Sequence, residues 1–268
     1  MEKEILEPIQ KNLSFVKNKI LIISGKGGVG KTTVSVNLAY ALERRGYKVG
    51  ILDADIHGPN VAKMLGAGEK LLIADSMIEP FKVLPNLKVI SMALILEKEE
   101  QPVIWRGPLK TNLIRQFLAE VRWGELDFLI IDSPPGTGDE PLSVAQFIPD
   151  LNGTIIITTP QEVAILDAKK AISFSKELGV PIIGVIENMS SFVCPFCGKE
   201  IELFGKGGGE KVAYEFGVSF LGRIPFSSSI VKSSDKGNPF IYYQDSVAST
   251  MEDVTDKILS FFKNENLT

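Results

Sequence analysis

The chain has 268 residues, of which 44% are hydrophobic and 23% are charged, and its formal net charge is -4. A chain of this length can bury one large core, so we expect a single domain over residues 1–268. The acidic balance argues against a nucleic-acid partner, and no stretch approaches the roughly 20 apolar residues that a membrane span needs. The charged N-terminus lacks the apolar core of a signal peptide, so we expect a cytoplasmic protein with neither nucleic acid nor membrane as a partner.

Short apolar runs alternate with helical patterns along the chain. The runs are rich in Ile, Leu and Val on both faces, which is typical of strands buried on both sides of a parallel sheet. They cover residues 19–24, 48–55, 87–92, 126–133, 153–159 and 181–188. Helical patterns cover residues 32–45, 109–121, 142–147, 163–178, 209–216 and about 246–262. This alternation predicts a doubly wound, mostly parallel α/β sheet with ligands at the carboxyl ends of its strands.

The remaining stretches are less regular. Residues 1–15 are a short N-terminal extension, and residues 66–86, 97–101 and 205–210 are expected to be surface loops. A loop over residues 190–209 contains the two cysteines of the chain.

A glycine-rich segment, GKGGVGKTT, follows the first predicted strand and opens the first helix. It satisfies G-x-x-x-x-G-K-[ST], in which glycines let backbone N–H groups surround phosphates, Lys31 reaches the outer phosphates and the Thr32 hydroxyl binds Mg²⁺. The same letters satisfy a dinucleotide pattern with Asp53 about 20 residues later, but that turn does not need a Lys-Thr pair. ATP with Mg²⁺ is therefore the predicted ligand of the whole segment: Gly25, Lys26, Gly27, Gly28, Val29, Gly30, Lys31, Thr32 and Thr33.

Lys26 stands at the second position of this loop. A lysine there resembles the deviant Walker A (MinD/ParA-like) group of P-loop NTPases, in which that side chain reaches the nucleotide of the other subunit. The resemblance implies a face-to-face homodimer with Lys26 in a catalytic role. A solvated loop lysine is the alternative interpretation.

Three aspartates lie at the ends of predicted strands, where nucleotide hydrolysis needs carboxylates. Asp132 precedes a Pro-Pro-Gly turn and can hold Mg²⁺ through its water shell, while the turn can respond to a γ-phosphate. Asp55 is our candidate for orienting the attacking water. Asp53 has either a structural or magnesium-shell role or a catalytic one, and capping of the following turn is an alternative for both Asp53 and Asp55. The single histidine, His57, is given no catalytic role.

Seven segments together resemble the Mrp/ApbC family of iron-sulfur cluster carrier ATPases over nearly the whole chain. They are GKGGVGKTT, DADIHGPN, VIWRGPL, IDSPPGTGD, TTPQEVAILDAKK, GVIENMSSFVCPFCG and FGKGGGEKVAYEFGVSFLGRIPF. The departures are Asn60, where the family usually has Ser, and Ala62, where it often has Pro. The resemblance implies that Asn188 hydrogen-bonds the adenine and that the backbone around Pro225 flanks its ring.

The two cysteines, Cys194 and Cys197, are too few for a metal site in one chain. A [4Fe-4S] cluster is normally held by four thiolates, and structural zinc likewise prefers four ligands. Two copies of CPFC facing each other across a homodimer would supply four. We therefore expect a cluster that bridges two subunits and is transferred to apo iron-sulfur proteins, with ATP hydrolysis coupled to its loading or release. Zinc in aerobically purified protein, a redox disulfide and inert thiols are the alternatives.

A second function class keeps the ATPase and discards the cluster. Relatives in the same P-loop class position division sites or segregate DNA, and a structural zinc clasp at the cysteines would suit such a nucleotide-switched binding module. This chain shows neither the basic amphipathic tail nor the basic patches that those proteins use. An anion pump or a reductase-like electron donor is a further alternative, although the reductase would want its cluster cysteines well separated along the chain.

Overall fold

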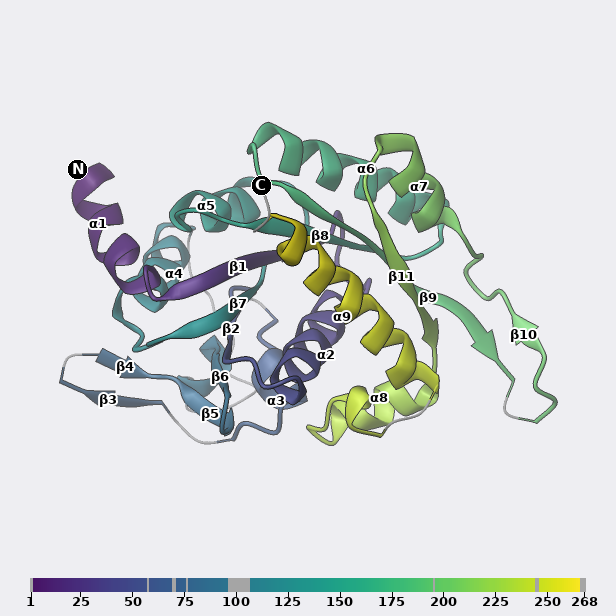
Figure 1. The fold of residues 1–268 in the computed structure, drawn as a ribbon, viewed down its shortest axis with the longest axis horizontal. Helices are drawn as coiled ribbons and strands as arrows, with labels where there is room; N and C mark the ends of the chain where they lie inside the picture. The colour runs from purple at the N-terminus through teal and green to yellow at the C-terminus, as the bar shows by residue number, and fades with distance from the viewer. Residues whose placement is uncertain are drawn as a thin grey trace.

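The computed structural model describes residues 2–56, 58–68, 71–75, 77–95, 107–194, 196–243 and 246–265. Within these residues the centre is a nine-stranded sheet in the order β10-β9-β8-β1-β7-β2-β6-β5, with β11 also pairing with β9 (Figure 1). Its strands are β1 (Val16–Ile23), β2 (Val49–Asp53), β5 (Phe81–Leu84), β6 (Leu87–Ile90), β7 (Leu126–Asp132), β8 (Gly153–Thr158), β9 (Ile182–Val193), β10 (Glu200–Ile201) and β11 (Phe220–Phe226). A separate two-stranded ribbon pairs β3 (Leu72–Ala74) with β4 (Met77–Glu79).

Adjacent side chains of the central strand β1 enter two different cores. Ile20 and Ile22 pack on one face of the sheet, whereas Leu21 and Ile23 pack on the other, and all four are buried. Strands β7 and β8 flank β1 in parallel register. Burial on both faces explains the continuous apolar runs in the sequence. The predicted doubly wound, mostly parallel sheet is confirmed, and the six predicted strands correspond to β1, β2, β6, β7, β8 and β9.

Helices cover both faces of the sheet (Figure 1). One face is covered by α2 (Lys31–Arg44), α3 (Val61–Met64), α8 (Ser228–Asp235) and α9 (Ser246–Glu265), together with the 3-10 turn η2 (Phe240–Tyr243). The other is covered by α1 (Glu2–Leu13), α4 (Gly107–Glu120), α5 (Asp139–Phe147), α6 (Glu162–Glu177) and α7 (Gly208–Phe216). A further 3-10 turn, η1 (Met92–Leu94), follows β6. None of the helices in the described parts of the chain is long and apolar enough to cross a membrane.

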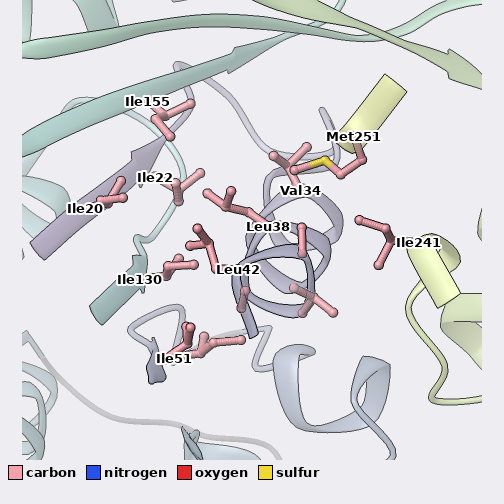
Figure 2. Close-up of a cluster of buried hydrophobic side chains, with 14 of the residues drawn as sticks. Ile20, Ile22, Val34, Leu38, Leu42, Ile51, Ile130, Ile155, Ile241 and Met251 are labelled. Carbon is pink, nitrogen blue, oxygen red and sulfur yellow. The ribbon is translucent and has the colours of Figure 1, made fainter. Parts of the chain in front are cut away.

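Helix α2 is held between the sheet and the C-terminal helix. Figure 2 shows its Val34, Leu38 and Leu42 side chains among the sheet isoleucines on one side and Ile241 and Met251 on the other. These five side chains are fully buried. Each such burial contributes about 1.5–3 kcal/mol relative to exposure. The N-terminus of α2, where the glycine-rich loop ends, is therefore a rigid support.

The predicted loop over residues 190–209 contains the end of β9, the strand β10 and the start of α7, and two of the three expected surface loops also contain regular structure. Residues 66–86 include β3, β4 and β5, and residues 205–210 end inside α7, which begins at Gly208. β3 to β5 are short strands in which no residue is buried, so they lack the double-faced apolar run by which the buried strands were recognised. The third expected loop, residues 97–101, lies outside the described residues.

The N-terminal segment adds a helix that the sequence patterns did not predict. Ile9 and Leu13, one helical turn apart in α1, are fully buried in the core shared with α4. The Asn12 side-chain amide donates to the carbonyls of Leu118 and Val121, both at 2.8 Å. These contacts fix α1 to the C-terminal end of α4.

Candidate nucleotide site and cysteine arm

The glycine-rich loop connects β1 to α2 at the carboxyl edge of the central strands. Gly28 and Gly30 have φ angles of 80° and 82°, which favour glycine. A Cβ on Gly30 would lie 2.1 Å from Asn188 Nδ2, and one on Gly25 would lie 2.2 Å from the Asp167 carbonyl oxygen. Gly27 faces Pro135 of the Pro-Pro-Gly turn that follows β7. The backbone is thus shaped so that its N–H groups and the α2 N-terminus can receive an anion.

Asp132 organises the polar centre at this edge. Its buried carboxylate pairs with Lys31 Nζ at 2.9 Å and accepts hydrogen bonds from Thr32 Oγ1 and Ser35 Oγ, each at 2.7 Å. The side chains of Lys31, Thr32 and Asp132, all predicted to act on the nucleotide, therefore meet at one point. Ser35 was missed, although its position one turn after Lys31 on α2 is a signal that the sequence contains.

Asp53 is the second buried carboxyl group and is the register partner of Asp132 on the neighbouring strand. Its Oδ2 accepts hydrogen bonds from Ser91 Oγ at 2.9 Å and from the Val61 N–H at 3.2 Å. Burial, and then the charge of Asp132, raise the pKa of Asp53 to about 8. These bonds connect Asp53 to the start of α3 and to Ser91, and its role toward the nucleotide stays a prediction.

Asp55 and Lys26 lie nearer the surface. Asp55 is half-buried, and its Oδ1 accepts from the Gly58 N–H at 3.4 Å. Its backbone N–H donates to Asp53 Oδ1 at 3.2 Å. Lys26 is half-buried, and its Nζ lies 3.5 Å from Gln161 Oε1, just before α6. Lys26 belongs to the glycine-rich loop itself, Asp55 follows β2 at the same edge of the sheet, and the neighbouring His57 lies outside the described residues.

A cavity of about 380 Å³ opens beside the first turn of α2. Thr32, Thr33, Asn188 and Pro225 all line it, so the residues that the resemblance assigned to adenine lie on one wall. The Asn188 side-chain amide also donates to the Val29 carbonyl at 2.8 Å and so ties the wall to the glycine-rich loop. The volume falls in the range of small-molecule sites, roughly 300–1,000 Å³.

The opposite wall of this cavity was missed by sequence reasoning. It is formed by Lys63 and Met64 of α3 and by Ile230 and Val231 of α8. Helix α8 begins with Ser227, which caps it by accepting a hydrogen bond from the Ser229 N–H at 3.2 Å. That capping serine after a strand is a helix-start signal that the sequence does contain.

The cysteines lie on an arm that leaves the body of the molecule. β9 continues beyond its pairing with β8, and the chain returns as β10, which pairs with the end of β9 on the right of Figure 1. The arm holds its turn with hydrogen bonds from the Cys194 N–H to the Lys199 carbonyl and from the Gly198 N–H to the Cys194 carbonyl, both at 2.9 Å. Phe196 is 96% exposed, and Cys197 is exposed as well.

The environment of Cys194 favours a thiolate. Backbone N–H groups of Phe196 and then of Cys197, together with the Cys197 side chain, lower the pKa of the Cys194 thiol. Amide donors pointing at a sulfur also suit a metal-bound thiolate. No cluster of three or more Cys, His, Asp or Glu side chains occurs in the parts of the chain that the structure describes, so these two thiols have no further ligand there.

The two candidate sites are joined by one strand. The glycine-rich loop, the three aspartates and the cavity, in which the resemblance places the adenine base, lie at one edge of the sheet, whereas the thiols do not join them. Cys194 follows Asn188 by six residues along β9 and its extension, which corresponds to roughly 20 Å of extended chain.

This fold and loop define the chain as a P-loop NTPase, and comparison with known proteins narrows the class. Residues 15–259 match the ParA family model described as NUBPL iron-transfer P-loop NTPase. A protein from Methanocaldococcus jannaschii, named an iron-sulfur cluster carrier protein, is 52% identical over 252 residues, which cover 94% of this chain and 87% of that protein. The chain therefore belongs to the NUBPL iron-transfer P-loop NTPase family, and the predicted resemblance to iron-sulfur cluster carriers is confirmed.

Solved structures agree on the fold. A nucleotide-binding protein from Archaeoglobus fulgidus in complex with ADP is 39% identical, with a TM-score of 0.78 over 88% of this chain and 93% of that one. The cell-division ATPase MinD from Pyrococcus furiosus is 23% identical, with a TM-score of 0.68 over 91% of this chain and 99% of that one. The MinD likeness concerns the fold alone, and it agrees with the predicted MinD/ParA-like group.

Proposed function

We propose that this protein is an ATP-hydrolysing carrier that holds an iron-sulfur cluster between two copies of the chain and delivers it to apo-proteins. The observation that carries the proposal is the arm, which presents two thiols, and no third ligand among the described residues, away from the body of the molecule. Family membership and the carrier name of the M. jannaschii relative support it.

The ligand count argues for a second copy. A [4Fe-4S] cargo takes four thiolates, and one arm offers Cys194 and Cys197. Two arms meeting about a two-fold axis would complete the set, as is usual for symmetric dimers. The exposed apolar side chains of Val193, Phe196 and Ile201 on the arm favour such a contact. A cargo shared in this way loses half of its ligands whenever the copies separate, which suits delivery.

The chemistry at the other site begins with the release of Lys31 from Asp132. In the ATP complex Lys31 would turn to the outer phosphates, and the α2 N-terminus would receive them. The Thr32 hydroxyl and the Asp132 carboxylate, 2.7 Å apart, are oxygen donors that fit a Mg²⁺ ion. Bound Mg²⁺ would neutralise charge on the phosphates.

Hydrolysis requires an oriented water at the γ-phosphate. Asp55, half-buried and just beyond the carboxyl end of β2, would orient this water and take its proton while the water oxygen bonds to phosphorus and the bond to the ADP oxygen breaks. Lys26 of each copy would reach the nucleotide of the other and stabilise the charge that develops. The nucleotide state would then set how the two copies, and with them the two arms, face each other.

The test is metal analysis of protein that is purified and reconstituted without oxygen, combined with the Cys194→Ser/Cys197→Ser variant. We expect about four irons and four sulfides per dimer in the wild type and none in the variant. The variant should keep its ATP affinity, because the thiols lie outside the nucleotide site. Transfer is then measured as activation of an apo iron-sulfur enzyme.

The competing outcomes are distinct. About one zinc per dimer with no iron, even after anaerobic reconstitution, would instead indicate a structural clasp on a nucleotide-switched binding module. A double variant that still binds the cluster would refute the thiol ligation. Cluster binding without transfer would leave a scaffold rather than a carrier.

A further inference from the structure

Met189 is the strained residue between the two sites. It has a φ of 54°, a left-handed conformation that is uncommon for a side chain of this kind, yet it lies inside strand β9. It follows Asn188, which contacts the glycine-rich loop, and precedes the arm with the cysteines. Backbone strain held in place by its surroundings often marks a functional position.

The strand pairing is irregular at the same place. Asn188 is paired with Ile224 of β11, but the next registered pair is Phe192 with Phe226, so β9 uses four steps where β11 uses two. Pro225, opposite this bulge, has no N–H to donate. The β8 pairing on the other side ends at Glu187. β9 is therefore held by β8 up to Glu187 and by β11 up to Asn188, bulges at residues 189–191, and pairs with β11 once more at Phe192 before it continues as the arm.

The near side of the bulge is firmly anchored. The buried Glu187 carboxylate accepts hydrogen bonds from Ser190 Oγ at 2.6 Å, from the Gly207 N–H at 3.0 Å and from the Gly209 N–H at 2.7 Å. These bonds tie β9 to the start of α7. Because β9 is fixed before the bulge, a displacement of the Met189 backbone would move the arm that follows the bulge.

The Met189 side chain contacts both parts of the nucleotide site. It lines the base cavity, and its Cε lies 3.8 Å from the position that a Cβ on Gly30 would occupy. A nucleotide that fills the cavity and binds the loop would therefore lie beside this side chain. The Asn188 side-chain amide donates to the Val29 carbonyl, so Asn188 and Met189 both lie beside the glycine-rich loop.

We infer that Met189 is a positioning residue that transmits nucleotide occupancy of the base cavity to the cysteine arm through the bulge in β9. The inference rests on the proposed function in one respect: the cluster would bind at the arm, so a movement of the arm would affect the cluster. The transmission itself needs only the nucleotide and the free thiols, so it can be tested without a cluster.

The experiment measures the rate at which iodoacetamide alkylates Cys194 and Cys197 in apo-protein, without nucleotide and at saturating Mg-ADP or a non-hydrolysable Mg-ATP analogue. In the wild type we expect nucleotide to change the rate by about fivefold. Met189→Gly and Met189→Asn, which relieve the strain or remove the side chain, should reduce that change to less than about 1.5-fold. Met189→Leu, which keeps an apolar side chain of similar size, should retain most of it.

Asp150→Gly is the matched control. Asp150 also has a positive φ, of 51°, but it lies before β8, at the amino ends of the strands and away from the nucleotide site. The variant should respond as the wild type does. Wild-type rates that ignore nucleotide, or a Met189→Gly variant that keeps the full response, would overturn the inference. Sedimentation of each sample shows whether dimerisation is unchanged, since a response due to dimerisation alone would survive in Met189→Gly.

Amide hydrogen exchange of residues 191–193 without nucleotide gives a second readout. Relaxing the bulge in Met189→Gly should speed this exchange by about fivefold or more, with no change in Asp150→Gly. Equal exchange in the wild type and Met189→Gly would also count against the inference. Failure of the proposed carrier function, seen as no bound iron, would leave both readouts interpretable.

Discussion

Asp53 and Asp132 place two carboxyl groups side by side at the ends of β2 and β7. Because burial and the Asp132 charge raise the pKa of Asp53 to about 8, the folded apo-protein keeps a proton there that the unfolded chain releases near its ordinary pKa. Between about pH 4 and pH 8 the folded state therefore binds more protons than the unfolded state, and the free energy of unfolding falls as pH rises.

We predict that Asp53 makes the free energy of unfolding of the wild type fall by up to about 1.4 kcal/mol per pH unit. The Asp53→Asn variant should lack this contribution. Urea unfolding from pH 5 to 8.5, without Mg²⁺ or nucleotide, measures it. Asp127→Asn is the control: although partial burial acts the other way, hydrogen bonds from Lys17 and the Lys48 N–H lower the pKa of Asp127, so its effect is confined to acid pH. Equal slopes in wild type and Asp53→Asn would contradict this account of Asp53.

Residue patterns located much of the candidate site in advance. Gly30, Lys31, Thr32 and Asp132 were recognised because phosphate and magnesium chemistry demands those types in that order, and the structure brings them together. Asn188 and Pro225 were assigned through family resemblance alone. No local pattern could reveal that their cavity is closed by α3 and α8, because that wall comes from packing between distant segments.

At the scale of elements, α3 and α8 depend on a close approach of two glycines. Gly66 and Gly237 both have positive φ, and a Cβ on Gly237 would lie 2.6 Å from the Gly66 Cα. Only bare backbones can pack this closely. The contact joins the segment that follows α3 to the segment that follows α8, and both helices line the cavity.

We predict that Gly237→Ala destabilises the fold by about 3 kcal/mol and weakens ATP binding, because it adds a clash to backbone strain. Gly179→Ala is the matched control: its φ is +67° but nothing lies within 4 Å, so strain alone should cost about 1 kcal/mol and ATP affinity should hold. Thermal unfolding measures the stability of the two variants, and ATP titration measures their affinity for ATP. A Gly237→Ala variant no worse than Gly179→Ala would show that the glycine contact does not support the cavity.

Strands and helices were predicted correctly where their burial requires a recognisable pattern of apolar residues in the sequence. β1, β7 and β8 have apolar residues on both faces, and α2 begins immediately after a recognisable loop. β3, β4 and β5 were missed because they have only three or four residues each and none of these is buried, so no extended apolar pattern marks them. α1 was missed because the contacts that hold it involve α4, more than 100 residues away.

At the scale of the whole molecule, one strand connects a nucleotide site to an exposed pair of thiols. The body of the protein holds the first part of β9 between β8 and β11, and the arm extends beyond them. The free thiols at the end of the arm indicate that a ligand or partner binds there. The ligand count points to a second copy, which is the central claim of the proposed function.

Native mass spectrometry of the anaerobically reconstituted protein tests that claim most directly. The bridging arrangement predicts that the mass of one cluster, about four irons and four sulfides, is found on dimers and that monomers released from them carry none. Clusters retained on monomers, or dimers of the wild type that carry no iron, would contradict it.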